Sequence, residues 1–444
     1  MSAHPTTVSG VSPARRVAAA VLRRVEQDGA YADRALAAEA TRAGLDPRER
    51  AFATQLAYGA VQRRRTLDHL IAACAGRPVA RLDPPVRDAL RLGVLQLLFL
   101  DGVAPHAAVD QSVELAKADG GPGFKLVNAV LRRAGREGTR LLAALDDATP
   151  RSAAVLHSVP DWIAELWWDA LGAEQARALL AVVNEPAESA LRVNTLVAEP
   201  GDVRAQLTER GMEARPAPPA LGAVALPDGL VLDTPFDPST DPLWAAGALA
   251  AQSRAAMTAA RLLDPPPGSR VLDLCAAPGG KATHLAALVG REGEVVAVER
   301  NPRRAAALRQ AVERLRAEPI VRVETADAAE PRADGPFDAV LVDPPCSGLG
   351  TLQGRPDLRW RARPEAVEQL AELQLRILTA GARALKPGSA LVYSTCTISP
   401  RENEGVVERF LAREPEFTLE RRHLLVPHRD ATDGFFYARL RRTV

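Results

Sequence analysis

The first third of the chain carries apolar residues at helical spacing. They recur at steps of three and four from Val17 to Val25, and a break follows at Asp28-Gly29. Five further stretches repeat the spacing: residues 47–63, 65–75, 84–100, 106–117 and 123–136. No alternating pattern interrupts them, so residues 13–145 are predicted to form an all-helical domain. Residues 1–12 are polar and contain Pro and Gly, which predicts a disordered tail.

Residues 146–240 have a different character, because prolines punctuate them at short intervals. Two helical stretches, 161–171 and 173–184, precede short strand-like pieces at Leu191–Asn194 and Leu230–Leu232. This mixture predicts a small α+β connecting domain.

Residues 241–444 alternate helical stretches with short, continuous apolar runs. The predicted helices cover 248–263, 280–289, 302–315 and 365–385; the predicted strands are Arg270–Leu274, Glu294–Val298, Ile320–Val323, Ala339–Val342 and Ala390–Tyr393. Apolar strands that alternate with helices are typical of a parallel sheet covered on both faces, an α/β fold of the Rossmann-like kind. Ligands bind such sheets at the carboxyl ends of the strands.

Charge and cysteine usage narrow the class of protein. The net charge of +1 hides a basic N-terminal third, with 21 Lys and Arg against 16 Asp and Glu in residues 1–150 and 35 against 39 in the remainder. That balance fits either a phosphate-rich partner or an ordinary solvated helical surface. The four cysteines form no CxxC pair, which disfavours a zinc site or a disulfide framework and fits a reducing cytoplasm. No signal core and no run of 18 apolar residues is present, so a cytoplasmic protein that does not enter a membrane is expected.

The segment from Val271 to Lys281 reads as a strand, a small-residue turn and a helix. Gly279 and Gly280 permit a tight turn and a close approach of a ligand, and the first amide groups of the helix favour a carboxylate. The segment is neither a dinucleotide fingerprint nor a P-loop. The next strand ends in Glu299, suited to ribose hydroxyls, and the third is followed by Asp327, suited to an adenine edge. Together these positions predict a nucleoside cofactor; with the cysteine motif that follows strand four, S-adenosylmethionine is favoured over NAD.

Two of the cysteines follow predicted strands. The fourth strand ends at Asp343 and runs into Pro344-Pro-Cys346, and the fifth ends in Tyr393-Ser-Thr-Cys396. Carbon-5 of cytosine accepts a methyl group only after a thiolate adds at carbon-6, so this chemistry needs a nucleophilic cysteine. It also needs a hydrogen-bonding group near nitrogen-3, a role that suits Asp343. Paired thiols at one sheet edge therefore predict a cytosine-5 methyltransferase.

The chain resembles the NOL1/NOP2/Sun family of RNA cytosine-5 methyltransferases in its motifs CAAPGGK, DPPCSGLGT, RPDLRW and STCT. Three further segments are similar to the bacterial branch of this family, which carries an N-terminal NusB-like RNA-binding domain. They are AFATQLAYGAVQRRRTLD, KLVNAVLRR and the ending DGFFYARLRR. The resemblance implies that Cys396 attacks, that Cys346 assists release of the methylated RNA, and that Asp343 and Lys281 lie at the active centre. It implies cofactor contacts from Cys275, Ala276, Ala277, Pro278, Gly279, Gly280, Lys281, Glu299, Asp327 and Asp343.

The implied substrate is a cytosine of 16S ribosomal RNA, with another RNA such as tRNA as the alternative. We expect a single-stranded or flipped base and a monomeric enzyme without a metal. Three departures from the family pattern keep the required groups: Glu299 for Asp, Gln252-Ser253 for Gln-Asp, and Pro344 for Ala. A DNA cytosine-5 methyltransferase would instead use Cys346 as nucleophile and carry a large recognition insert. An exocyclic-amine methyltransferase and a non-catalytic RNA-binding factor are the remaining alternatives.

Several other residues are candidates for RNA contact. Arg192 and Asn194 belong to an RVN strand expected to face RNA. Arg63, Arg64, Arg65, Arg132 and Arg133 suit either phosphates or a solvated helix face. Arg355, Asp357, Arg359 and Trp360 follow the Cys346 motif and are expected to order a lid over the base, although packing is the favoured role for Trp360.

Overall fold

The computed structural model describes residues 10–118, 122–238 and 240–443. Contacts divide the chain into two compact units. The helical unit contains the residues up to Asn184 together with Leu352–Arg361, and the sheet unit contains Glu185–Thr351 and the residues from Ala362 onward. The chain therefore leaves the sheet unit after Thr351, contributes one short segment to the helical unit and returns at Ala362.

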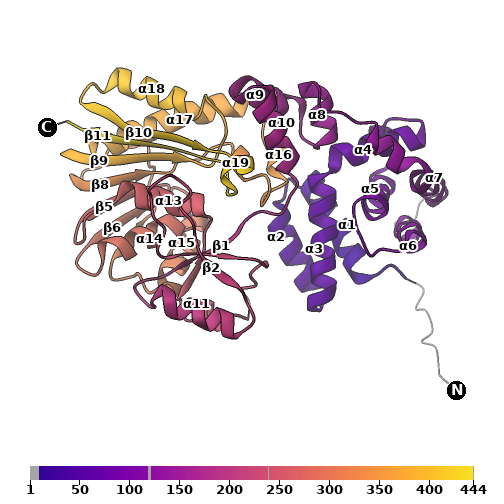
Figure 1. Ribbon diagram of the computed structural model, residues 1–444, viewed down its shortest axis with the longest axis horizontal. Helices are drawn as coiled ribbons and strands as arrows, with labels where there is room; N and C mark the ends of the chain where they lie inside the picture. The colour runs from indigo at the N-terminus through magenta and orange to yellow at the C-terminus, as the bar shows by residue number, and fades with distance from the viewer. Residues whose placement is uncertain (1–9, 119–121, 239, 444) are drawn as a thin grey trace. The chain divides into compact units, whose positions relative to one another are not determined.

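The described part of the helical unit contains only helices and their connections (Figure 1). Pro13, Pro47 and Pro84 each stand at the first position of a helix, where the missing amide hydrogen costs nothing. Leucine, valine and alanine side chains from α1 to α7 form one core. The elements are α1 Pro13–Gln27, α2 Ala32–Arg42, α3 Pro47–Gln62, α4 Arg64–Ala75, η1 Val79–Arg81, α5 Pro84–Leu98, α6 Pro105–Ala118, α7 Phe124–Ala143, α8 Pro150–Leu156, α9 Asp161–Leu171, α10 Ala173–Val182 and α16 Leu358–Arg361.

Residues 146–184 pack with the helical unit, although the sequence pattern groups them with a connecting domain. Thr66 of α4 donates to the carbonyl of Val155, and Arg65 forms an ion pair with Asp161 at 2.6 Å. These contacts join residues about 90 positions apart, so punctuation by proline does not reveal them. Helices α2 and α8 were not among the predicted elements.

The predicted disordered tail is only partly within the described residues. Residues 1–9 lie outside them. The end of the segment is ordered, contrary to the prediction: Val11 is buried, and the backbone amide of Ser12 donates to Gln111 at 2.8 Å.

The sheet unit begins with a small antiparallel sheet of order β2-β3-β1-β4. Its elements are β1 Ser189–Val193, α11 Pro200–Glu209, β2 Ala214–Pro216, β3 Gly229–Leu232, α12 Pro242–Ala245 and β4 Leu249–Ala251. The prediction of one helix over 248–263 is wrong at its start. Residues 249–251 pair with β1, and the helix begins only at Arg254, where the Ser253 side chain caps it.

The large sheet has the order β10-β11-β9-β8-β5-β6-β7. Strands β5 to β9 are parallel as predicted, whereas β11 is antiparallel to both β9 and β10, so the sheet is mixed. Strand β10 was not predicted, because five of its nine residues are exposed and a charged run, Glu420 to Arg422, interrupts its apolar residues. The elements are α13 Arg254–Leu263, β5 Arg270–Leu274, α14 Gly280–Val289, β6 Glu294–Val298, α15 Pro302–Arg314, β7 Val321–Glu324, β8 Phe337–Val342, η2 Leu349–Thr351, α17 Pro364–Arg383, β9 Leu385–Thr395, α18 Glu404–Arg413, β10 Phe417–Leu425, α19 Pro427–Asp430 and β11 Phe435–Arg442.

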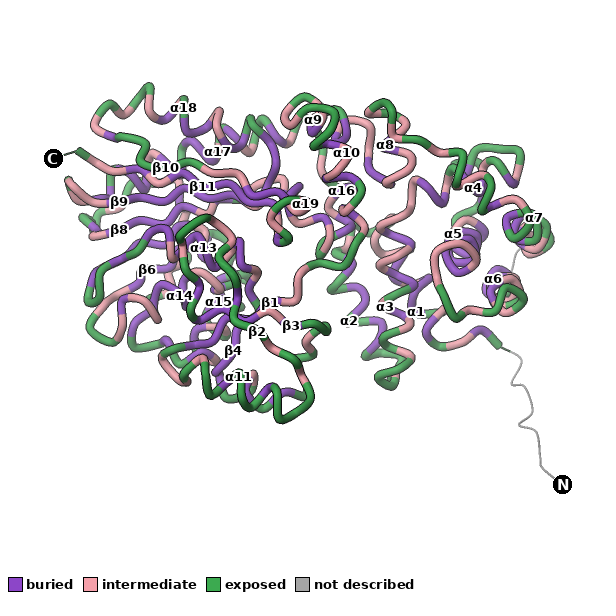
Figure 2. Tube along the Cα trace, in the orientation of Figure 1, coloured by how far each residue is buried: buried purple, intermediate pink, exposed green. Residues whose placement is uncertain are grey.

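Helices bury both faces of the large sheet, as the continuous apolar strands predict. One core contains side chains of α13, α14 and α15, and the other contains side chains of α17 and α18. The central strands are accordingly buried along most of their length (Figure 2). Among the described residues, no helix combines the length and the apolar composition needed to cross a membrane. The α/β fold class with a preceding helical domain is confirmed.

Candidate active site

The turn between β5 and α14 has a backbone that only certain residues accommodate. Gly279 has φ of +111°, a backbone conformation that residues with a side chain rarely adopt. A Cβ there would also lie 2.9 Å from a methyl group of Leu308, so both the backbone and the packing favour glycine. Cys275 also has a positive φ, of 67°. Helix α14 begins at Gly280, and its first amide groups lie where the turn meets the edge of the sheet.

Asp273 is a further acidic group beside this turn, and the sequence reading did not single it out. It is fully buried at the end of β5, and both of its carboxylate oxygens lack a hydrogen-bond donor among the described residues. Burial, with a smaller effect from the charge of Asp343, raises the pKa of Asp273 to about 8. Burial also raises the pKa of the Cys275 thiol, which disfavours it as a nucleophile.

The two acids after β6 and β7 are both at the carboxyl edge of the sheet. Glu299 is 4% exposed, and one carboxylate oxygen accepts from the amide of Asn301 at 2.8 Å. Asp327 accepts from the amide of Ala329 at 3.0 Å and lies 3.7 Å from Arg300. The parallel register of β5, β6 and β7 therefore brings both acids to the edge that carries the glycine turn.

Asp343 stands at the end of β8 and is held from two sides. Lys281 of α14 donates to one carboxylate oxygen at 2.8 Å, and the Ser394 hydroxyl of β9 donates to the other at 3.0 Å. Burial works against the ammonium form of Lys281, but the charge and hydrogen bond of Asp343 outweigh it and raise the lysine's pKa. Ser394 is a site residue that the sequence reading missed, and its place directly before Thr395-Cys396 was the available signal.

The two thiols of Cys346 and Cys396 lie 3.3 Å apart, sulfur to sulfur, without a disulfide. The hydrogen bond with Cys396 and burial raise the pKa of Cys346 well above its usual value. Cys346 therefore holds its proton. The charge of Cys396 is among the causes that raise the pKa of Lys281, so the lysine and this thiol interact electrostatically.

The RVN strand does not face RNA, contrary to the prediction. Arg192 and Asn194 are 0% and 1% exposed. Arg192 donates to Gln252 at 2.9 Å and to Thr283 at 3.0 Å, while the Asn194 amide donates to the carbonyls of Gly247 and Leu315. These hydrogen bonds join the small sheet to α14 and to the end of α15. Gln252, which retains the glutamine of the family's Gln-Asp pair, is the side chain that accepts from Arg192.

The segment after the Cys346 loop, predicted to order a lid over the base, packs into the helical unit. Arg359 is 0% exposed and donates to five acceptors of that unit at 2.8–3.3 Å: the carbonyls of Gln62, Ser158, Val183 and Leu352 and the side-chain oxygen of Asn184. The Trp360 indole donates to the carbonyl of Val61 at 2.7 Å, so the favoured packing role of this tryptophan is confirmed.

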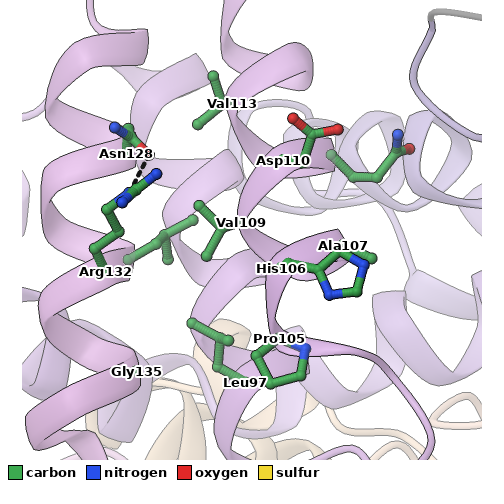
Figure 3. Close-up of a pocket in the computed structure, with 12 residues that line it drawn as sticks. Leu97, Pro105, His106, Ala107, Val109, Asp110, Val113, Asn128, Arg132 and Gly135 are labelled. Carbon is green, nitrogen blue, oxygen red and sulfur yellow. Dashed lines mark hydrogen bonds between the residues drawn. The ribbon is translucent and has the colours of Figure 1, made fainter.

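Most of the arginines proposed for phosphate contact have partners within the helical unit. Arg63 and Arg64 lie over the rings of Phe99 and Trp360, and Arg65 is paired with Asp161. Arg132 binds Asn128, and Arg133 binds Glu137. Figure 3 shows Arg132 beside a groove of about 800 Å³ lined by residues of α5, α6 and α7. No cysteine lines this groove, so thiol chemistry has no basis there.

The fold and the site define a class of protein: a Rossmann-like methyltransferase that places two thiols and a carboxylate at the carboxyl edge of its sheet. Comparison with known proteins agrees. Residues 260–441 match the family described as 16S rRNA methyltransferase RsmB/F, residues 12–136 match the NusB family, and residues 159–237 match the RsmF/B-like ferredoxin-like domain. The chain belongs to the RsmB/F family of 16S rRNA methyltransferases, and its methyl donor is S-adenosylmethionine.

Relatives match along almost the whole chain. The ribosomal RNA small subunit methyltransferase B of Thermus thermophilus is 38% identical, covering 96% of this chain and 97% of its own. The probable methyltransferase B of Synechocystis is 36% identical, covering 97% and 99%. The crystal structure of PH0851 superimposes with a TM-score of 0.81 at 27% identity, covering 98% of this chain and 99% of its own.

Proposed function

We propose that the protein methylates carbon-5 of a cytosine in 16S ribosomal RNA and that Cys396 forms a transient covalent bond to carbon-6 of the base. The observation that carries this proposal is the pair of thiols 3.3 Å apart beside the Lys281–Asp343 pair. Two thiols and a hydrogen-bonded carboxylate at one sheet edge fit a covalent cytosine-5 mechanism. They are unnecessary for transfer to an exocyclic amine.

The residues around the glycine turn fit the methyl donor. The amide groups at the start of α14 suit its carboxylate, and the unsatisfied oxygens of buried Asp273 suit a cationic or N–H donor. Glu299 suits ribose hydroxyls, and Asp327 suits the adenine edge. We assign the remaining contacts to Cys275, Ala276, Ala277, Pro278, Gly279 and Gly280 of the turn, with Lys281 and Asp343 beside it. When bound, the donor supplies an electrophilic methyl group.

Four side chains of the site are assigned separate roles in the reaction: Cys396, Lys281, Asp343 and Cys346. The Cys396 thiolate, favoured by Lys281, forms a bond to carbon-6 of the base, and the electron pair of the ring double bond moves to carbon-5, which takes the methyl group. Asp343, held by Lys281 and Ser394, is assigned the hydrogen bond with nitrogen-3 of the base, and the Lys281 ammonium bound to it offsets the negative charge that develops there. Solvent takes the carbon-5 proton, the electron pair of that C–H bond re-forms the double bond between carbon-5 and carbon-6, and the carbon–sulfur bond breaks to release the Cys396 thiolate. Cys346, which keeps its proton beside the Cys396 sulfur, assists this release.

The alternative substrate is another RNA such as tRNA, and the two are separated by where the methyl groups appear. A DNA cytosine-5 methyltransferase would attack with Cys346, yet in this structure that thiol holds its proton more firmly than a free cysteine. The target base must be unstacked to reach the thiol, so we expect a single-stranded or flipped cytosine and a monomeric enzyme.

The test uses a strain that lacks the gene, complemented with the wild type, Cys396→Ala or Cys346→Ala. Bisulfite sequencing of its ribosomal RNA is expected to show one cytosine protected by the wild type and unprotected with Cys396→Ala. Cys346→Ala is expected to accumulate a covalent protein–RNA adduct, detected as a slower band after nuclease trimming and mapped by peptide mass to Cys396. An unchanged cytosine pattern in ribosomal RNA would refute the substrate. Activity retained by Cys396→Ala would refute the assigned nucleophile.

A further inference from the structure

A buried glutamate joins the two loops that carry the thiols. Glu402 is 0% exposed and lies between β9 and α18. Its carboxylate accepts from the Ser347 amide at 2.8 Å and from the Ser347 hydroxyl at 2.5 Å. The Ser347 hydroxyl is also 2.7 Å from the Thr397 hydroxyl. Ser347 directly follows Cys346, and Thr397 directly follows Cys396. The Thr397 hydroxyl also donates to the Glu402 carboxylate itself, at 3.5 Å. One carboxylate therefore binds the residue that follows each thiol.

Glu402 is itself fixed by neighbouring elements. Gln374 of α17 donates to its carboxylate at 3.1 Å and to the carbonyl of Pro345 at 2.9 Å. The Tyr393 hydroxyl of β9 donates to the backbone carbonyl of Glu402 at 2.6 Å. Glu402 thus has hydrogen-bond partners on α17, on β9 and on the Cys346 loop, which restricts where its carboxylate can lie.

We propose that Glu402 is a positioning residue that holds the Cys346 loop against the end of β9 and, through its negative charge, disfavours a thiolate at Cys346, so that Cys396 is the thiol that attacks. This inference rests on the proposed roles of the two cysteines. The distance of 3.3 Å between the two thiols does not by itself determine which one attacks, and we assign that distinction to Glu402.

The charges that face Cys346 agree with this assignment. Its pKa is raised by the hydrogen bond with Cys396, by burial, and by the charges of Cys396, Glu402 and Asp343. Burial raises the pKa of the nearby Tyr393 hydroxyl as well. Burial also raises the pKa of Glu402, while hydrogen bonds from Ser347, Gln374 and Ser399 favour its charged form. The cation of the site, Lys281, is bound to Asp343, and the charge of Cys396 is among the causes that raise its pKa. Negative charge near Cys346 and positive charge near Cys396 therefore separate two otherwise similar thiols.

Two substitutions separate the charge of Glu402 from its shape. Glu402→Gln keeps the size and an oxygen acceptor for the Ser347 amide but removes the charge. Glu402→Asp keeps the charge and shortens the reach. Glu404→Gln makes the same chemical change two residues away, in the first turn of α18, and serves as the matched control. All three are made in the full chain carrying Cys396→Ser, so that Cys346 is the only thiol of the pair.

The measurement is the rate of alkylation of Cys346 by iodoacetamide between pH 6 and 10, read by peptide mass so that Cys74 and Cys275 do not contribute. Glu402→Gln is expected to raise the rate at pH 8 by about threefold or more and to move the profile to lower pH. Glu402→Asp and Glu404→Gln are expected to keep the profile of the parent. An unchanged profile in Glu402→Gln would overturn the proposal, and so would equal changes in the Gln and Asp variants, because loosened packing alone would explain them. The assay contains neither RNA nor methyl donor, so its outcome is independent of the proposed methyl transfer.

Discussion

Gly350 is the position where a single methyl group is expected to disturb the site most directly. It lies in the loop after Cys346, and its amide donates to the carbonyl of Cys396 at 3.0 Å. Its own carbonyl accepts from the amide of Gly434 at 2.8 Å. A Cβ on Gly350 would lie 2.0 Å from the carbonyl oxygen of Gly434. Gly350 therefore brings the backbone beside Cys396 and the start of β11 closer together than any side chain allows.

The cost of Gly350→Ala follows from these distances. Ordinary contact begins at 3.4 Å, so the two backbones must separate by about 1.4 Å. Two hydrogen bonds, each with a net contribution of about 1 kcal/mol, would be lost or weakened. Overpacking against a backbone atom adds about 1–3 kcal/mol. The free energy of unfolding should therefore fall by about 2–5 kcal/mol. A displacement of this size at Cys396 should slow methyl transfer by about 100-fold.

The assay combines urea denaturation of the full chain with single-turnover methyl transfer to RNA at saturating methyl donor. Gly201→Ala is the matched control, because it lies in α11 of the same unit and a Cβ there meets nothing within 4 Å. It should leave both quantities within the error of the wild type or raise stability slightly. Wild-type stability and rate in Gly350→Ala would refute the close approach of these two backbones.

Two further predictions concern buried charge. His284 is fully buried, with Nε2 2.9 Å from Asp228, and burial lowers its pKa to about 4 despite that carboxylate. Because the folded-state pKa lies below the unfolded value of 6.5, this contribution to stability is present above pH 6.5 and is lost as pH falls toward 4. His284→Gln should therefore lose less stability over that interval in urea titrations, and slopes equal to the wild type would contradict the shift. Arg359→Met leaves five acceptors of the helical unit without their donor and should destabilise that unit by about 3 kcal/mol or more. Limited proteolysis and denaturation measure this loss, with Arg355→Met as the control. Equal stability of the two variants would contradict the buried role of Arg359.

Local sequence predicted the elements that depend on local pattern. The bounds of β5 and β6 agree with the predicted strands residue by residue, and α9 begins and ends as its apolar spacing indicates. The edge strand β10 was not predicted, because five of its nine residues are exposed and a charged run, Glu420 to Arg422, interrupts its apolar residues. The predicted start of α13 was wrong for another reason. Leu249–Ala251 has a composition compatible with a helix but pairs with β1, a strand almost 60 residues earlier.

The candidate site, like the fold, was predicted from the sequence only in part. By itself the sequence determined the glycine turn, the acids after successive strands and the two cysteines after β8 and β9, because parallel strands bring residues at their carboxyl ends to one edge. Only the tertiary structure decided which polar side chains are internal. Arg192 and Arg359 look like RNA contacts in the sequence and are buried in the fold, while Ser394 and Glu402 looked ordinary and hold the carboxylate and the thiol loops. The physical reason is that a polar side chain is buried only when partners distant in the chain satisfy it, and those partners exist only once the chain has folded.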